Sequence, residues 1–86
     1  MKQTKKDQVS HEVTVFSTPT CPYCYMAKTY LKEKNIQFQD IDVSRNQEQA
    51  IKMVQRSGQM GVPQLWIDDK VVIGFDQPAI DQILGL

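Results

Sequence analysis

The most constraining feature of this sequence is a pair of cysteines at the point where a strand-like run gives way to a helix-like run. Residues 13–17 are rich in β-branched and aromatic side chains, as is typical of a strand. A turn of small polar residues follows, and Cys21 and Cys24 then open a stretch with apolar residues at helical spacing. A C-x-x-C between a strand and a helix is typical of a dithiol or disulfide redox site.

The start of the helix explains why the two cysteines should differ. Pro22 suits the first helical position, where its missing N–H would have no intrahelical partner. Cys21 is then the N-cap, where free N–H groups and a partial positive charge favour its thiolate form. Cys24 lies one turn inside, more enclosed, and we expect its pKa to be the higher of the two. We therefore expect Cys21 to attack a disulfide and Cys24 to attack the resulting mixed disulfide.

Three other interpretations of the two cysteines are weaker. Tetrahedral zinc needs four ligands, and His11 is the one strong candidate beside the pair. A structural disulfide would close so short a loop that it removes little entropy from the unfolded chain. Two unrelated buried cysteines fit poorly with the polar turn before Cys21. The pattern therefore favours redox chemistry and predicts no metal site.

Length and charge limit the remaining functions. The 86 residues suffice for one small domain, near the lower size limit for independent folding. Ten basic and ten acidic residues cancel, so nothing predicts binding to nucleic acid or to an anionic membrane. No apolar stretch approaches the length of a membrane span, and no signal-peptide pattern opens the sequence. We expect a cytoplasmic protein, whose cysteines rest reduced and cycle.

The rest of the sequence predicts a single α/β domain at residues 12–86, after a flexible N-terminal tail at residues 1–11. The first two strands should be parallel, because a helix joins them in a right-handed crossover. A tight turn should make the last two strands an antiparallel hairpin. The order is therefore β-α-β-α-β-β-α. The expected elements are strand 13–17, a helix from 22 to about 34, strand 37–42, a helix ending at 57, strands 64–68 and 71–74, and helix 77–84.

Several side chains are predicted to define the helices. Ser44 followed by Gln47 reads as a capping box for the second helix, and Asp76 as the cap of the third. Lys52 and Arg56 are expected on a solvated helix face. The side chains expected to face inward from the three helices are Met26, Ala27, Tyr30, Leu31, Ala50, Ile51, Val54, Ile80, Ile83 and Leu84.

Pro63 is the second informative residue. A proline cannot donate to a sheet ladder, so it should lie at the entrance of the strand that follows. We predict a cis bond between Val62 and Pro63, packed against the dithiol. The neighbouring backbone could then pair with an incoming peptide-like substrate.

Taken together, residues 12–86 resemble the glutaredoxins, within the thioredoxin-like fold. Cys21-Pro22-Tyr23-Cys24 is similar to the dithiol active site of that family. The segments similar to the region around its cis-proline are Ser57-Gly58, Val62-Pro63-Gln64 and Trp66-Ile67-Asp68. The resemblance implies a four-stranded mixed sheet flanked by three helices, with the dithiol beside Pro63 and thiol–disulfide exchange as the reaction.

The resemblance also implies glutathione as a co-substrate, disulfide-bearing or glutathionylated proteins as partners, and no bound cofactor. Val62 would pair through its backbone with the cysteinyl part of glutathione, and Tyr23 would flank the sulfur. Asp76 would meet the γ-glutamyl amine, and N–H groups of its helix the adjoining carboxylate. The site residues implied are Cys21 and Cys24 as catalytic residues and Pro22, Tyr23, Gln59, Val62, Pro63, Phe75 and Asp76 as binding residues.

Four departures from the family pattern bear on the electron donor. Thr18 and Gln59 stand where basic residues are common, and Gly61 stands where threonine is usual. A shortened loop, residues 74–77, replaces the usual Gly-Gly-x-Asp-Asp. Without the two cations, one carboxylate of glutathione loses charge-assisted contacts. The pattern is similar to glutaredoxin-like proteins reduced by thioredoxin reductase, which is the main alternative. A glutathione-bridged iron–sulfur scaffold is a further alternative, against which the second cysteine counts.

Overall fold

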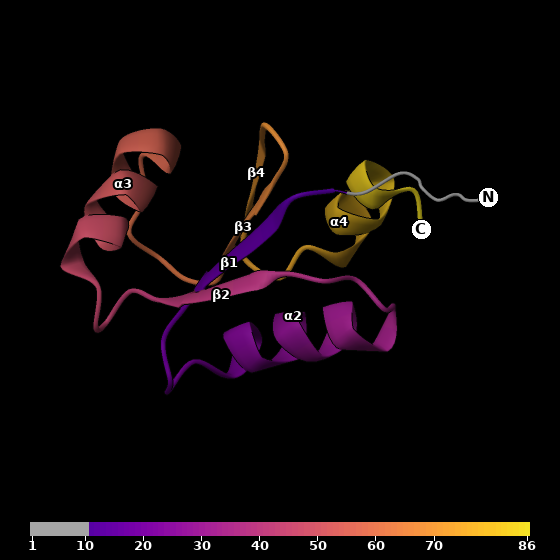
Figure 1. The fold of residues 1–86 in the computed structure, drawn as a ribbon, viewed down its shortest axis with the longest axis horizontal. Coiled ribbons are helices and arrows are strands. Elements are labelled where there is room, and N and C mark those ends of the chain that lie inside the picture. The colour runs from indigo at the N-terminus through magenta and orange to yellow at the C-terminus, as the bar shows by residue number, and fades with distance from the viewer. Residues whose placement is uncertain (1–10) are drawn as a thin grey trace.

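The computed structural model describes residues 11–86 as a four-stranded sheet with three helices (Figure 1). The predicted tail therefore lies outside the described residues, apart from His11. The predicted order of elements is confirmed. The elements are β1 (Val13–Ser17), α2 (Pro22–Glu33), β2 (Gln39–Asp42), α3 (Gln47–Ser57), β3 (Gln64–Ile67), β4 (Lys70–Ile73) and α4 (Gln77–Leu84).

The sheet has the strand order β2-β1-β3-β4. Strands β1 and β2 are parallel and are joined through α2, as the crossover rule predicts. Strand β3 is antiparallel to both β1 and β4, so the sheet is mixed. Because β1 is central, the turn that follows it delivers Cys21 to the middle of one end of the sheet. The α/β, thioredoxin-like prediction is confirmed.

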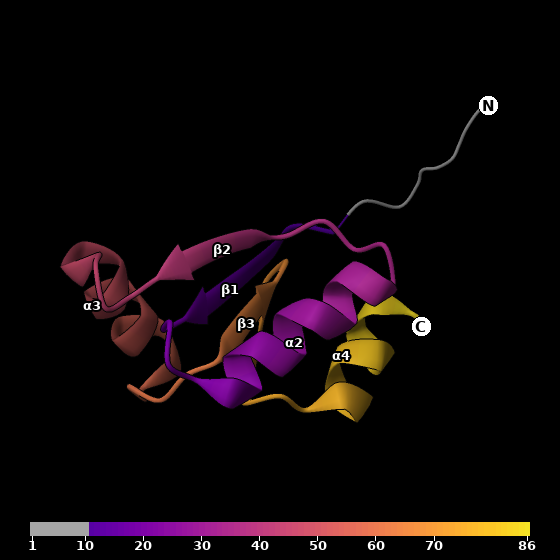
Figure 2. The same ribbon diagram turned by 90° about the horizontal axis from the view of Figure 1, so that it is seen from below.

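One face of the sheet, which we call the closed face, carries the main apolar core. Side chains alternate along a strand, so Val13 and Val15 of β1 share this face with Leu65 and Ile67 of β3. Helices α2 and α4 lie side by side over it (Figure 2), and the Tyr30 hydroxyl on α2 donates to the Asp81 carboxylate on α4. The other buried members of this core are Ala27, Leu31, Val72, Ile80 and Leu84.

The opposite face, which we call the open face, is covered by α3 at one end of the sheet (Figure 1). The rings of Phe16 and Trp66 contact each other there in a tilted arrangement, with centroids 4.4 Å apart, and Met53 of α3 is buried. The Arg56 guanidinium lies 4.6 Å from the centre of the Trp66 ring. Arg56 is exposed, as predicted for a solvated helix face, and it also contacts the Trp66 ring.

Three local predictions are wrong: Ile51 of α3, expected to face inward, is 50% exposed, and the other two concern Ser44 and Met26. Ser44 does not cap α3, because its N–H and hydroxyl both donate to the Asp42 carboxylate in the preceding turn. Asn46 is the N-cap instead, and its side chain accepts the Gln49 N–H. Met26, predicted to be buried, is 46% exposed. The buried line of α2 runs through positions 24, 27 and 31, which leaves Met26 to one side.

No helix within residues 11–86 combines the length and the apolar character needed to cross a membrane. The longest, α2, has 12 residues, whereas a membrane-spanning helix needs about 20.

Candidate active site

Cys21 is the N-cap of α2, as predicted, and is half-buried. Its backbone is extended (φ −101°, ψ 109°), and Pro22 occupies the first helical position. The Cys24 N–H donates to the Cys21 sulfur at 3.1 Å. A hydrogen bond from a helix N-terminus favours the charged form of the acceptor. The Cys21 sulfur therefore lies at the positively polarised end of α2.

Cys24 lies behind Cys21 with 1% of its surface exposed. Burial raises the pKa of the Cys24 thiol to about 12, and the hydrogen bond with Cys21 adds to the rise. The predicted difference in enclosure between the two cysteines is confirmed. At neutral pH Cys24 is therefore a thiol, held next to the more accessible sulfur of Cys21.

The segment before β3 lies against the dithiol. The peptide bond between Val62 and Pro63 is cis, as predicted, and Pro63 is buried. The Cys21 thiol donates to the Val62 carbonyl, with 3.7 Å between sulfur and oxygen. Residues 41 positions apart in the chain thus meet at the tip of the sheet.

Gln64 holds this segment in place and is a residue that the sequence analysis did not single out for a role. Its side chain is fully buried at the start of β3. Its Nε2 group donates to the carbonyl of Gln59 at 3.0 Å and to that of Gly61 at 2.9 Å. The Ser57 hydroxyl adds a third tie, because it accepts the Gln59 N–H at 3.1 Å. The available signal was a polar residue opening an otherwise apolar strand.

The predicted residues Phe75 and Asp76 are reached through the loop after β4. The Gly74 N–H donates to the Pro63 carbonyl at 2.8 Å, so this loop begins beside the cis-proline. Asp76 caps α4 as predicted, by accepting a backbone N–H of its first turn. The Phe75 ring, however, packs 5.7 Å from the ring of Tyr30 and against the core. Its ring therefore packs beside a side chain of α2, and its assignment as a binding residue stays a prediction.

The surroundings of the dithiol include large exposed side chains. Tyr23, directly after Pro22, is 63% exposed, and Met60, two residues before Val62, is 79% exposed. Tyr25 is 71% exposed as well. Apolar and aromatic surface beside an accessible sulfur suits contact with a peptide or protein.

Lys28, one turn beyond Cys24 on α2, is paired with Asp40 of β2 at 2.9 Å. Asp40 also accepts the hydroxyl of buried Ser17 at 2.7 Å. Burial alone would raise the pKa of Asp40, but the hydrogen bonds from Lys28 and Ser17 outweigh it and lower the pKa below its ordinary value. These groups line a cleft of about 220 Å³ beside the turn that precedes Cys21. Lys28 is thus already engaged by a carboxylate.

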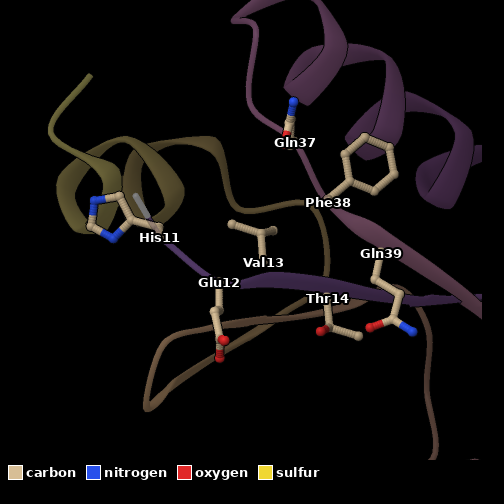
Figure 3. A pocket seen from close by; sticks show the side chains of 7 residues that line it. All are labelled: His11, Glu12, Val13, Thr14, Gln37, Phe38 and Gln39. Atoms are coloured by element: carbon tan, nitrogen blue, oxygen red, sulfur yellow. The ribbon is translucent and has the colours of Figure 1, made fainter. Parts of the chain in front are cut away.

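A separate cleft of about 420 Å³ lies at the other end of the sheet, where β1 and β2 begin (Figure 3). It is lined by residues 11–14 and 37–39 and contains none of the predicted site residues. His11 at its rim pairs with the Asp68 carboxylate at 2.6 Å. Within residues 11–86, no three His, Cys, Asp or Glu side chains are grouped as metal ligands would be.

A C-x-x-C at the start of a helix, next to a cis-proline in a mixed four-stranded sheet, defines the thioredoxin-like class of redox proteins. Residues 13–72 match the glutaredoxin family model. The chain belongs to the glutaredoxin family, and it is a thiol–disulfide oxidoreductase.

Two relatives illustrate the match. An uncharacterized glutaredoxin-like 8.6 kDa protein in the rubredoxin operon of Clostridium pasteurianum is 40% identical, over 84% of this chain and 96% of its own. Glutaredoxin 3 of Escherichia coli K12 is 38% identical, over 86% of this chain and 90% of its own.

Solved structures agree with the fold. A thioredoxin-like protein matches with a TM-score of 0.82 at 27% identity, over 86% of this chain and 95% of that one. A buckwheat glutaredoxin in complex with glutathione matches with a TM-score of 0.70 at 24% identity, over 87% and 71%. At that identity the second likeness is one of fold.

Proposed function

We propose that the protein reduces protein disulfides and glutathione mixed disulfides through Cys21 and Cys24, and that glutathione restores the dithiol. The observation that carries this proposal is the position of the Cys21 sulfur. It is the half-buried N-cap of α2, receives the Cys24 N–H and lies 3.7 Å from the Val62 carbonyl. An incoming disulfide can therefore meet the sulfur and a free backbone edge together. A reducing compartment such as the cytoplasm suits this cycle.

The reaction runs in two exchange steps. The Cys21 thiolate attacks one substrate sulfur, a mixed disulfide forms, and the other substrate sulfur leaves as a thiolate. Cys24 then attacks the Cys21 sulfur and releases the second substrate thiol, and the departing thiolate takes up the proton that Cys24 gives up. Substrate gains two electrons, and the protein is left with a Cys21–Cys24 disulfide. Two molecules of glutathione reduce it and become glutathione disulfide.

Glutathione would bind along the segment before β3. The Val62 backbone would pair with its cysteinyl residue as one strand pairs with another. The capped start of α4 at Asp76 would receive the γ-glutamyl end, and exposed Tyr23 would lie beside the sulfur. A buckwheat glutaredoxin of the same fold forms a complex with glutathione.

A second electron donor, a thioredoxin reductase, is favoured by the residues that replace the usual cations. Thr18 and Gln59 are uncharged, and Lys28 is paired with Asp40. A hydrogen bond to a charged group contributes about 1.5–3 kcal/mol, and each 1.4 kcal/mol is about tenfold in affinity. Losing one or two such contacts would weaken glutathione by about tenfold to a thousandfold. Glutathione binding would then be weak rather than absent, and a thioredoxin reductase is the alternative electron donor.

Cysteine variants test the assigned roles. Cys21→Ser should abolish disulfide reduction, because no nucleophile then remains at the helix cap. Cys24→Ser should accumulate mixed disulfides, detectable by mass spectrometry, and should keep some activity on glutathionylated substrates. Faster alkylation of Cys24 than of Cys21 at mildly acidic pH would reverse the assignment.

A coupled NADPH assay tests the electron donor. Glutathione with glutathione reductase should sustain turnover faster than thioredoxin reductase does. Thr18→Lys should increase the glutathione-dependent rate by restoring a cation beside the site, and Thr18→Met is the uncharged control of similar length. Efficient reduction by thioredoxin reductase, together with no gain from Thr18→Lys, would favour the second donor instead.

A further inference from the structure

Gln64 is a fully buried polar residue whose hydrogen bonds are only partly satisfied, which is unusual for a residue that serves stability alone. The side chain is fully buried, and its Nε2 group has two acceptors, the carbonyls of Gln59 and Gly61. Two carbonyls can accept only from the nitrogen, so they fix which way the amide points. Its Oε1 atom then faces away, buried and without a hydrogen-bond partner among the described residues. A buried oxygen without a hydrogen bond lowers the stability of the fold.

The geometry of the peptide unit turns these contacts into a consequence at the site. In a trans peptide the carbonyl and the following N–H point in opposite directions. The Gly61 carbonyl points inward, onto the Gln64 amide. The Val62 N–H, which belongs to the same peptide unit, therefore points outward. The Met60 N–H is turned outward in the same way by the Gln59 carbonyl.

We propose that Gln64 is a positioning residue that aims the Val62 N–H at the backbone carbonyl of a peptide-like substrate. The inference rests on the proposed function, because it gives that N–H an acceptor in the substrate. Gln64 touches neither sulfur in the described contacts and acts through the orientation of one peptide unit. The next carbonyl along, that of Val62, faces Cys21. Val62 thus donates its N–H to the substrate, while its carbonyl lies beside the Cys21 sulfur.

Glutamine meets this requirement and its close substitutes do not. A glutamate of the same shape has no N–H, and at neutral pH its carboxylate would repel both carbonyls. A methionine fills similar space but leaves both carbonyls unpaired, so the Gly61–Val62 peptide unit is free to turn. The unpaired Oε1 atom is lost in methionine, which offsets part of the cost in stability. Gln64→Met is therefore a variant expected to fold.

Kinetics of the pre-reduced protein on two disulfides, in the absence of glutathione, test the proposal. With a glutathionylated peptide, Gln64→Met should raise KM about tenfold and leave kcat within about twofold. With 2-hydroxyethyl disulfide, which has no peptide carbonyl, the variant should match the wild type; glutathione is left out because it would convert this substrate into a glutathione mixed disulfide. The matched control is Ile67→Ala, at the far end of β3, which should be less stable but keep the wild-type KM for both disulfides. A loss of stability alone does not produce this split between substrates.

A binding measurement separates the proposal from the chemistry. S-methylglutathione cannot be reduced, so its Kd, measured by NMR titration, reports recognition only. Gln64→Met should weaken it about tenfold. Equal Kd values for the two proteins, or equal losses on both disulfides, would overturn the role of Gln64 while the proposed function stands. A wild-type protein that reduces neither disulfide would overturn the proposed function itself.

Discussion

The two faces of the sheet are built on different principles. On the closed face, apolar side chains fill the core from Val15 of the central strand to Ile80 of α4, and buried Ser17 at the end of β1 has its hydroxyl paired with Asp40. On the open face, buried Gln64 lies on the same side as Trp66, and each has a buried polar atom without a partner among the described residues. The first face is a core in the ordinary sense. The second combines partial burial with polar groups that cost free energy.

The difference teaches where stability and recognition reside in so small a protein. A domain of this size has little core to spare, and the closed face supplies most of it. The open face can then carry groups chosen for their direction. Gln64 orients the segment before β3 through two hydrogen bonds, and the Arg56 guanidinium lies over the Trp66 ring. The start of α2 and the segment before β3 are the two functional elements. They meet at one end of the sheet, where Cys21 contacts Val62.

The largest effect should come from breaking the closed face alone. Ile67→Ala removes a fully buried side chain at the end of β3 away from the dithiol. Substitutions of this kind cost about 2–5 kcal/mol of unfolding free energy. Urea denaturation should show that loss, while the rate of disulfide reduction per folded molecule stays at the wild-type value. A fall in that rate matching the loss of stability would show that the faces are not separable.

The fold was predictable because its signals are local. Alternating apolar residues identify the strands, Pro22 and Gly85 mark helix ends, and the strand–helix–strand order sets a parallel pair. The prediction for Ser44 is wrong because both Ser44 and Asn46 are suitable N-cap residues just before α3, and Asn46 takes that position. The contact of the Ser44 hydroxyl with Asp42 is visible only in three dimensions.

The candidate site was predictable in part for the same reason. The contrast between Cys21 and Cys24 follows from one helix start, so the sequence predicts it directly. Gln64 acts through carbonyls three and five residues earlier, in a loop whose shape no local rule specifies. Phe75 comes to the site from the family pattern and stays a prediction, and only the three-dimensional structure shows that its ring packs beside that of Tyr30.

The next effect concerns Cys24, on the buried side of α2. Burial raises its pKa from an ordinary value of 9.0 to about 12. The unfolded chain therefore loses this proton at a lower pH than the folded one does. The protonated Cys24 thiol therefore contributes its full share to the unfolding free energy below about pH 9. That contribution falls as the pH rises toward 12, by at most about 1.4 kcal/mol per pH unit.

Reduced wild type and Cys24→Ser should be compared by denaturation between pH 8 and about pH 11, where tyrosine and lysine titrate in both proteins. The difference between their unfolding free energies should narrow as the pH rises, because only the wild type carries the buried thiol. A constant difference would mean that Cys24 ionises as readily in the folded protein as in the unfolded chain. Cys24 would then not share the enclosure of the closed face.

The smallest effect should come from the open face, and two neighbours on β4 provide the matched pair. Val72 faces the closed core with 4% of its surface exposed, whereas Ile73, the next residue, is 40% exposed. Threonine keeps the β-branched shape of both side chains but adds a hydroxyl. In Val72→Thr that hydroxyl is buried without a designed partner, at a cost of about 1–3 kcal/mol. In Ile73→Thr water can reach it, so the change should stay within about 0.5 kcal/mol. Chemical denaturation of the two variants side by side measures the contrast, and equal losses would show that the sheet has two closed faces rather than one.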